Sequence, residues 1–124
     1  MTSTILIADD SPTLRMLVRR ALEPGRHRIV EAEDGGVALS LLARDAADLV
    51  ITDVNMPEMD GLTLIRRLRA MPDYRFTPIL VLTTESGDDV KTRGREAGAT
   101  GWLVKPFESA RLRTVVDQVL RRRA

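Results

Sequence analysis

The chain has 124 residues, and 19 lysines and arginines nearly balance 18 aspartates and glutamates, for a formal net charge of +1. This length suits one domain with its own hydrophobic core, and the balanced charge provides no overall field for binding nucleic acid or a membrane surface. The lack of cysteine excludes disulfides and thiolate chemistry, and a single histidine argues against a zinc site made of protein ligands alone.

No stretch has the pattern of a signal peptide or of a membrane-spanning helix, because the first residues lead directly into a short apolar strand. We therefore expect a cytoplasmic protein without nucleic-acid or membrane partners. We also expect residues 1–124 to form one monomeric domain without a separate effector domain.

The first elements form a strand, an acidic turn and a helix. Residues 4–8 are an apolar run that Asp9 and Asp10 close, and Ser11 and Pro12 then supply a helix N-cap and a proline at the first helical position. The predicted helix ends before a Pro-Gly pair. Its apolar face is expected to carry Leu14, Leu17, Val18, Ala21 and Leu22, with Arg15, Arg19 and Arg20 off that face.

A weak second strand covers residues 27–32, and His27 is expected to be an exposed side chain without a catalytic role. A second helix follows the Asp-Gly-Gly turn at residues 34–36, with Val37, Ala38, Leu41 and Leu42 on its apolar face. Residues 48–53 then form a continuous apolar strand that ends in Asp53, which is typical of the interior of a parallel sheet.

The second half of the chain repeats this alternation. A third helix begins at a turn formed by Asp60 and Gly61, and residues 78–83 form another buried strand. A fourth helix opens at residues 86–89, contains Gly94, which lowers its helix propensity, and closes at Gly98. Residues 101–104 form a fifth strand, a Lys-Pro turn follows, and Glu108 or Ser109 caps the last helix.

Five strands alternating with five helices predict an α/β fold, in which a doubly wound parallel sheet is covered on both faces. The weak second strand suits a sheet edge and the two strongest apolar runs suit the interior, which favours the flavodoxin-like strand order 2-1-3-4-5. No Gly-rich loop follows the first strand, so a dinucleotide or P-loop site is not expected.

In this topology five polar side chains meet at the carboxyl ends of the strands, where ligands bind in open α/β sheets. They are Asp9, Asp10, Asp53, Thr83 and Lys105. Three carboxylates at one point repel each other unless a cation neutralises them, and oxygen ligands with open positions for water suit Mg²⁺. The hydroxyl and the ammonium group can face a tetrahedral oxyanion from the other side.

This set of groups indicates phosphoryl transfer onto a carboxylate, with Asp53 as the nucleophile. Asp10 is expected to hold the magnesium ion directly and Asp9 through water, and the backbone carbonyl of Asn55 completes the coordination. The lysine would neutralise one phosphoryl oxygen, and the threonine would donate a hydrogen bond to another.

These residues resemble the receiver domains of two-component response regulators. The matching parts are Asp9-Asp10, the run from Asp53 to Gly61, Thr83, and Lys105-Pro106-Phe107, in the same order on alternating strands and helices. The resemblance implies that Asp53 accepts phosphate from a phosphohistidine on a sensor histidine kinase and that the Lys105-Pro106 peptide is cis. It also implies that phosphorylation shifts the face made of the fourth helix, the fifth strand and the fifth helix.

Asn55 and Glu85 are most similar to the corresponding residues of stand-alone chemotaxis regulators of the CheY type. This implies a downstream protein target, such as a flagellar-motor component, rather than catalysis on other molecules. Two alternatives stay open, a phosphorelay intermediate or phosphate sink, and a hydrolase of the haloacid-dehalogenase type. The hydrolase needs an acidic residue where Asn55 stands and a cap-sized insertion that the chain lacks.

Two positions depart from the pattern of the family. Trp102 stands where the family usually has tyrosine or phenylalanine, and we expect it to switch together with Thr83. Thr84 stands where a smaller residue is common, and its bulk is expected to hinder the approach of water to the phosphoryl group. Asn55, Thr84 and Glu85 are therefore the candidates for tuning dephosphorylation.

Overall fold

The computed structural model describes residues 2–123, so the two terminal residues of the expected domain lie outside the described range. One parallel sheet has the order β2-β1-β3-β4-β5, which confirms the doubly wound, flavodoxin-like prediction. The strands are β1 (Thr4–Ala8), β2 (Arg28–Ala32), β3 (Leu49–Thr52), β4 (Ile79–Thr83) and β5 (Gly101–Val104).

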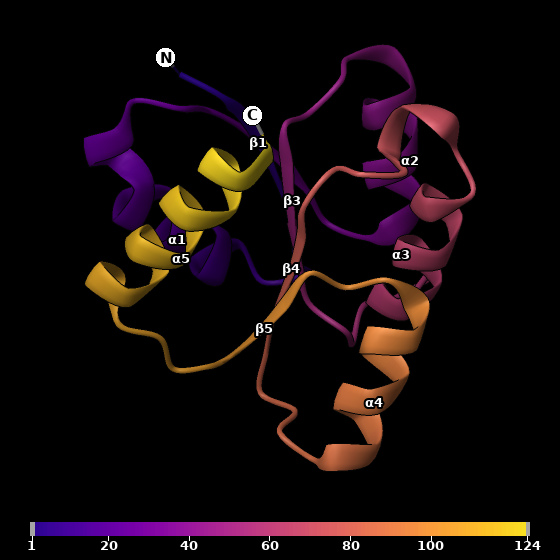
Figure 1. Cartoon of the computed structure of the whole chain (residues 1–124). Helices are drawn as coiled ribbons and strands as arrows, with labels where there is room; N and C mark the ends of the chain where they lie inside the picture. Colours follow the sequence, from indigo (N-terminus) through magenta and orange to yellow (C-terminus); the bar gives the residue numbers. More distant parts are fainter. Residues whose placement is uncertain (1, 124) are drawn as a thin grey trace.

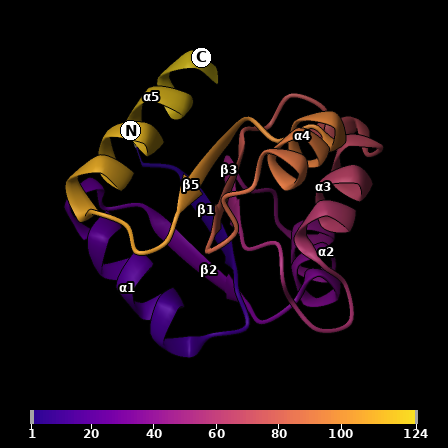
Figure 2. The ribbon, with the colours of Figure 1, turned by 90° about the horizontal axis from the view of Figure 1, so that it is seen from below.

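Helices cover both faces of the sheet. They are α1 (Pro12–Leu22), α2 (Gly35–Arg44), α3 (Gly61–Arg69), α4 (Asp88–Ala97) and α5 (Ser109–Arg123), with short 3-10 turns η1 (Glu23–Gly25) and η2 (Pro72–Tyr74). α1 and α5 pack together on one face, and α2, α3 and α4 lie side by side on the other (Figure 1). The same two layers stand on either side of the sheet when the molecule is seen from below (Figure 2).

Two hydrophobic cores result from the alternation of side chains along each buried strand. In β1, Ile5 and Ile7 belong to the core under α1 and α5, whereas Leu6 and Ala8 belong to the core under α2, α3 and α4. Strands β3 and β4 divide their side chains in the same way. A strand that is buried on both faces is apolar along most of its length, which explains the continuous apolar runs in the sequence.

The register of the sheet brings the ends of its strands to one edge. Ala8 of β1 is paired with Thr52 of β3, and Thr83 of β4 with Val104 of β5. The residues that directly follow these strands are Asp9, Asp53 and Lys105, and they therefore lie above the same edge. This arrangement positions the candidate site.

The helix starts agree with the caps that the sequence predicts. The Ser11 hydroxyl accepts a hydrogen bond from the backbone N–H of Leu14, and Asp60 caps α3 through the N–H of Thr63. Aspartate in this position favours the helix through the helix dipole as well as through the hydrogen bond. Asp60 thus acts as a helix cap, as predicted.

Three side chains differ from the expectations. Val37, expected on the apolar face of α2, is 36% exposed. Leu17 was expected on the buried face of α1 but is 43% exposed, because it lies over the β5–α5 connection beside Phe107 rather than over the sheet. His27 is half-buried rather than exposed, since its Nδ1 accepts a hydrogen bond from the backbone N–H of Ser3 at 3.1 Å. In the described part of the chain, no helix combines the length and the apolar character needed to cross a membrane.

Candidate functional site

Three carboxylates come together where β1 and β3 end. Asp9 and Asp10 follow β1, and Asp53 follows β3, held by a hydrogen bond of 3.0 Å from its backbone N–H to the carbonyl of Ala8. Each of the three side chains offers a carboxylate oxygen within 4.8 Å of the others. Asp9 and Asp53 are buried, whereas Asp10 is exposed. The site is thus an acidic cluster that is open to solvent on one side.

Lys105 joins this cluster from the end of β5. Its Nζ lies 2.8 Å from Asp9 Oδ2 and 2.9 Å from Asp53 Oδ2, and its side chain is only 11% exposed. The backbone N–H of Lys105 donates to the carbonyl of Thr83 at 2.8 Å, which fixes where the side chain starts. Burial by itself lowers the pKa of Lys105, but the hydrogen bonds to Asp9 and Asp53 and their charges raise it above its usual value. The ammonium group therefore stays charged at neutral pH.

The donor set of the cluster fits a hard divalent cation. Carboxylate oxygens are the ligands that Mg²⁺ and Ca²⁺ prefer, and the exposed Asp10 leaves room for coordinated water. The second oxygens of the two buried aspartates are oriented by backbone N–H groups, Asp9 Oδ1 by Ser11 at 2.9 Å and Asp53 Oδ1 by Val54 at 2.6 Å. Asn55 lies two residues after Asp53 and is exposed. That its backbone carbonyl coordinates the metal ion stays a prediction.

Thr83 and Trp102 are connected through the backbone of one residue, Glu85. The Thr83 hydroxyl is buried and accepts a hydrogen bond from the backbone N–H of Glu85 at 3.3 Å. The carbonyl of Glu85 in turn accepts the indole N–H of Trp102 at 2.9 Å. A displacement of Thr83 would therefore change the surroundings of the Trp102 ring. The indole N–H, which needs a partner when it is half-buried, is satisfied in this way.

Gly94 accounts for the space that the larger ring needs. A Cβ atom at Gly94 would lie 2.5 Å from Cζ3 of Trp102, so only glycine lets the indole pack this closely on α4. From the sequence alone, this glycine is notable only because it lowers the helix propensity of α4. In the structure, it makes room for the indole ring of Trp102.

Thr84 and Lys105 line one shallow apolar hollow beside the acidic cluster. The other lining residues are Leu14, Leu17, Pro106, Phe107 and Ser109. Thr84 is exposed there, and Glu85 is half-buried.

The Lys105-Pro106 peptide is cis, which confirms the expectation taken from the family.

Arg15 is a feature of the site that the sequence pattern did not reveal. Its guanidinium donates through Nη1 to the backbone carbonyl of Asp9 at 2.5 Å and through Nε to Glu31 Oε1 at 2.9 Å. The available signal was an arginine in the first turns of α1, close to the acidic pair, together with a carboxylate near the end of the neighbouring strand β2. Neither residue belongs to the apolar periodicity that marks the helices and strands in the sequence.

Comparisons with known proteins agree with this geometry. A family model described as the response regulator receiver domain matches residues 5–117. The chemotaxis protein CheY-3 of Vibrio cholerae is 37% identical over 119 residues, which cover 95% of this chain and 92% of that protein. The crystallised chemotaxis protein CheY4 of Vibrio cholerae superimposes with a TM-score of 0.91 at 39% identity, covering 96% of this chain and 99% of that one.

A third neighbour bears on the metal. The receiver domain of the sensor histidine kinase PA1611 from Pseudomonas aeruginosa was solved with a magnesium ion coordinated in its active site cleft. It is 26% identical to this chain with a TM-score of 0.89, and the match covers 98% of this chain and 99% of that domain.

Proposed function

Since this chain belongs to the response regulator receiver domain family, a family of signalling switches, we propose that it is a phosphorylation-activated switch of the chemotaxis type. The observation that supports this best is the contact of one largely buried lysine, whose side chain is 11% exposed, with two buried aspartates at the carboxyl ends of the strands. The chemotaxis names of the relatives support the pathway. They also support a cytoplasmic location as part of the same proposal.

The proposed reaction uses Asp53 as phosphoacceptor. A carboxylate oxygen of Asp53 attacks the phosphorus of a phosphohistidine on a sensor histidine kinase, the P–N bond breaks, and the imidazole leaves with that electron pair. Val54 and Lys105, which hydrogen-bond the two oxygens of Asp53, hold the carboxylate in place for this attack. The chain catalyses no reaction on other molecules in this proposal.

Mg²⁺ is the proposed cofactor, held by Asp9, Asp10, Asp53 and the carbonyl of Asn55. When bound, it supplies positive charge next to the phosphoryl oxygens. The acidic cluster and the magnesium ion named for the related PA1611 receiver support this assignment. Lys105 supplies the second positive charge, and its high pKa keeps that charge in place.

The phosphoryl group selects one of two conformations of the domain. It adds negative charge that Lys105 and the Thr83 hydroxyl compensate, so the conformation in which both contacts form gains free energy. Thr83 then leaves the N–H of Glu85, and Trp102 responds because its indole N–H is bound to the carbonyl of the same residue. The proposed result is a changed face of α4, β5 and α5 that a downstream protein binds, for example a flagellar-motor component.

Emission from Trp102 tests this coupling, because it is the only tryptophan in the chain. Beryllium trifluoride with Mg²⁺, a mimic of the phosphoryl group, is expected to shift or quench the emission of the wild type and to leave Asp53→Asn unchanged. An unchanged wild-type spectrum, with binding of the mimic demonstrated by calorimetry, would contradict motion of this ring.

Asn55, Thr84 and Glu85 are proposed to set the lifetime of the phosphorylated form. Thr84 is exposed in the hollow beside Lys105, where its methyl group can obstruct the path of water. We expect Thr84→Ala to accelerate dephosphorylation a few-fold and Thr84→Val, which keeps the bulk, to leave the rate near that of the wild type. The decay of radiolabelled phosphoprotein measures this, and equal rates in all three proteins would refute the role.

Phosphotransfer from candidate histidine kinases is the experiment that tests the whole proposal. Radiolabel from a phosphorylated chemotaxis kinase is expected on the wild type, and only when Mg²⁺ is present. A pull-down with and without the mimic then separates an output switch from a relay. Binding of a motor component only with the mimic supports the switch. The relay is the second candidate, since PA1611 carries a related receiver within a histidine kinase, and passage of the label to another histidine would support it.

A further inference from the structure

We infer that Arg15 is a positioning residue for the metal-binding turn, in which it holds the peptide group between Asp9 and Asp10. This inference rests on the proposed magnesium site and adds a residue that does not itself contact the ion. Arg15 acts through the backbone of Asp9, and Glu31 anchors it from the neighbouring strand.

The contacts of Arg15 run from α1 to the turn that follows β1 and to β2. Its Nη1 lies 2.5 Å from the carbonyl oxygen of Asp9, and its Nε lies 2.9 Å from Glu31 Oε1. Its side chain is only 15% exposed. The planar guanidinium presents both donors in a fixed geometry, so one side chain can hold the acidic turn and β2 at the same time.

The hydrogen bond from Arg15 to the Asp9 carbonyl matters more for the position of the Asp10 side chain than for that of Asp9. The Asp9 carboxylate is held independently by Lys105 at 2.8 Å and by the N–H of Ser11 at 2.9 Å. Asp10 is exposed, and within residues 2–123 its carboxylate has no hydrogen-bond partner. The Asp9 carbonyl belongs to the peptide that leads to Asp10, so Arg15 restricts the direction in which Asp10 projects.

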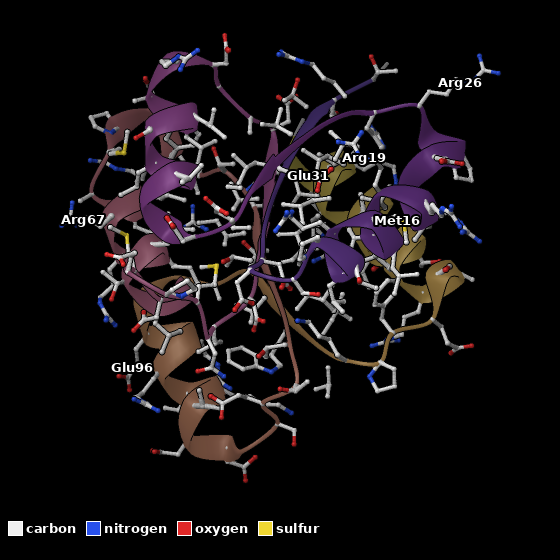
Figure 3. The ribbon with its side chains drawn as sticks, turned by 180° about the vertical axis from the view of Figure 1, so that it is seen from behind. Met16, Arg19, Arg26, Glu31, Arg67 and Glu96 are labelled. Carbon is white, nitrogen blue, oxygen red and sulfur yellow. The ribbon has the colours of Figure 1, made fainter. Side chains whose placement is uncertain are left out.

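Glu31 is the anchor on the other side. Its second oxygen pairs with Arg19 at 2.8 Å, and Figure 3 shows Arg19 and Glu31 side by side. Burial alone raises the pKa of Glu31, but hydrogen bonds and charges from Arg19 and Arg15 lower it below its usual value. Glu31 therefore remains ionised at neutral pH and offsets the charge of Arg15 near a site that must accept a cation.

Positioning and simple electrostatics predict opposite signs for the loss of Arg15. If the arginine acted only as a charge, its removal would strengthen Mg²⁺ binding, because like charges repel. If it orients the turn, its removal weakens binding, as loss of groups that orient metal ligands usually does. The sign of the change in Mg²⁺ affinity therefore separates the two roles.

Calorimetric titration of the full chain with Mg²⁺ alone is the test. We expect Arg15→Met to weaken binding about tenfold and Arg15→Lys to have an intermediate effect, because lysine keeps the charge but loses the two-pronged geometry. Arg19→Met is the matched control, since it removes the same charge and the other partner of Glu31 without touching Asp9. It is expected to bind Mg²⁺ like the wild type. Urea unfolding of all variants shows that each is folded at the temperature of the titration.

Asp10→Asn distinguishes failure of this inference from failure of the proposed function. If the wild type binds Mg²⁺, Asp10→Asn does not, and Arg15→Met binds as tightly as the wild type or more tightly, the inference is wrong and the magnesium site stands. If binding by the wild type is absent or does not depend on Asp10, the proposed site fails and the inference falls with it. Equal losses in Arg15→Met and Arg19→Met would also overturn it, since they would reflect a general loosening of α1.

Discussion

Replacing Asp53 with asparagine is expected to reduce phosphotransfer from a histidine kinase to background. An amide oxygen is too weak a nucleophile to take the place of a carboxylate, and no other aspartate of the cluster receives a hydrogen bond from both Lys105 and the N–H of Val54. The measurement is radiolabel on the chain after incubation with phosphorylated kinase and Mg²⁺.

The loss should come from chemistry rather than from unfolding. The amide oxygen of asparagine can still accept the hydrogen bond from Val54, and Lys105 keeps its pair with Asp9 at 2.8 Å. We therefore expect the free energy of unfolding to change by about 1 kcal/mol or less. Urea denaturation followed by circular dichroism measures it.

Asp60→Asn is the matched control for this experiment. Asp60 is an exposed aspartate seven positions later in the chain that caps α3 through the N–H of Thr63, and asparagine caps helices equally well. The control should accept as much label as the wild type. Label on Asp53→Asn at the wild-type level would show that another residue is the phosphoacceptor.

Most of the fold could be predicted because burial on two faces leaves a strong mark on a sequence. β4 lies within the predicted run at residues 78–83, and β5 has the predicted bounds of residues 101–104. The weak run at residues 27–32 contains β2, which lies at an edge of the sheet as predicted. Polar residues directly after such runs must gather at one edge, which is why Asp9, Asp53 and Lys105 were found together.

Tertiary contacts between two particular side chains or backbone groups leave no periodic pattern in the sequence, so they could not be predicted from it. The sequence pattern places Arg15 only off the apolar face of α1, whereas in the structure its guanidinium contacts the Asp9 carbonyl. Leu17 fits the apolar stripe of α1 but is exposed, because periodicity does not tell which part of a stripe extends beyond the sheet. From the sequence, Gly94 predicts only a weak helix α4. It does not reveal that the ring of Trp102 packs against this position and requires a glycine there.

Gly61 also makes a close tertiary contact that the sequence pattern does not show. Gly61→Ala is expected to destabilise the domain by about 3 kcal/mol. A Cβ atom at this position would lie 1.9 Å from the carbonyl oxygen of Asp53 and 3.0 Å from the Cα atom of Val54. Both neighbours are backbone atoms, so no side-chain rotation relieves the clash. The gain of about 1 kcal/mol in helix propensity from glycine to alanine is too small to offset it.

Gly87→Ala provides the comparison, since a Cβ atom there has no neighbour within 4 Å. It should change the free energy of unfolding by less than about 1 kcal/mol, because it alters only the N-cap of α4. Urea unfolding of the two variants and the wild type measures the difference. Similar stabilities of Gly61→Ala and Gly87→Ala would mean that α3 moves away from the Asp53–Val54 turn at little cost.

The same substitution also tests how the start of α3 supports the phosphoacceptor. The N–H of Gly61 donates to the carbonyl of Val54 at 2.8 Å, so α3 and the residue that follows Asp53 are joined at the point of the clash. An alanine must push the Asp53 backbone toward the sheet or push α3 away from it. Either shift moves the carboxylate relative to Lys105, which is attached to a different strand. We therefore expect Gly61→Ala to accept label more slowly than Gly87→Ala even at a low temperature at which circular dichroism shows both to be folded.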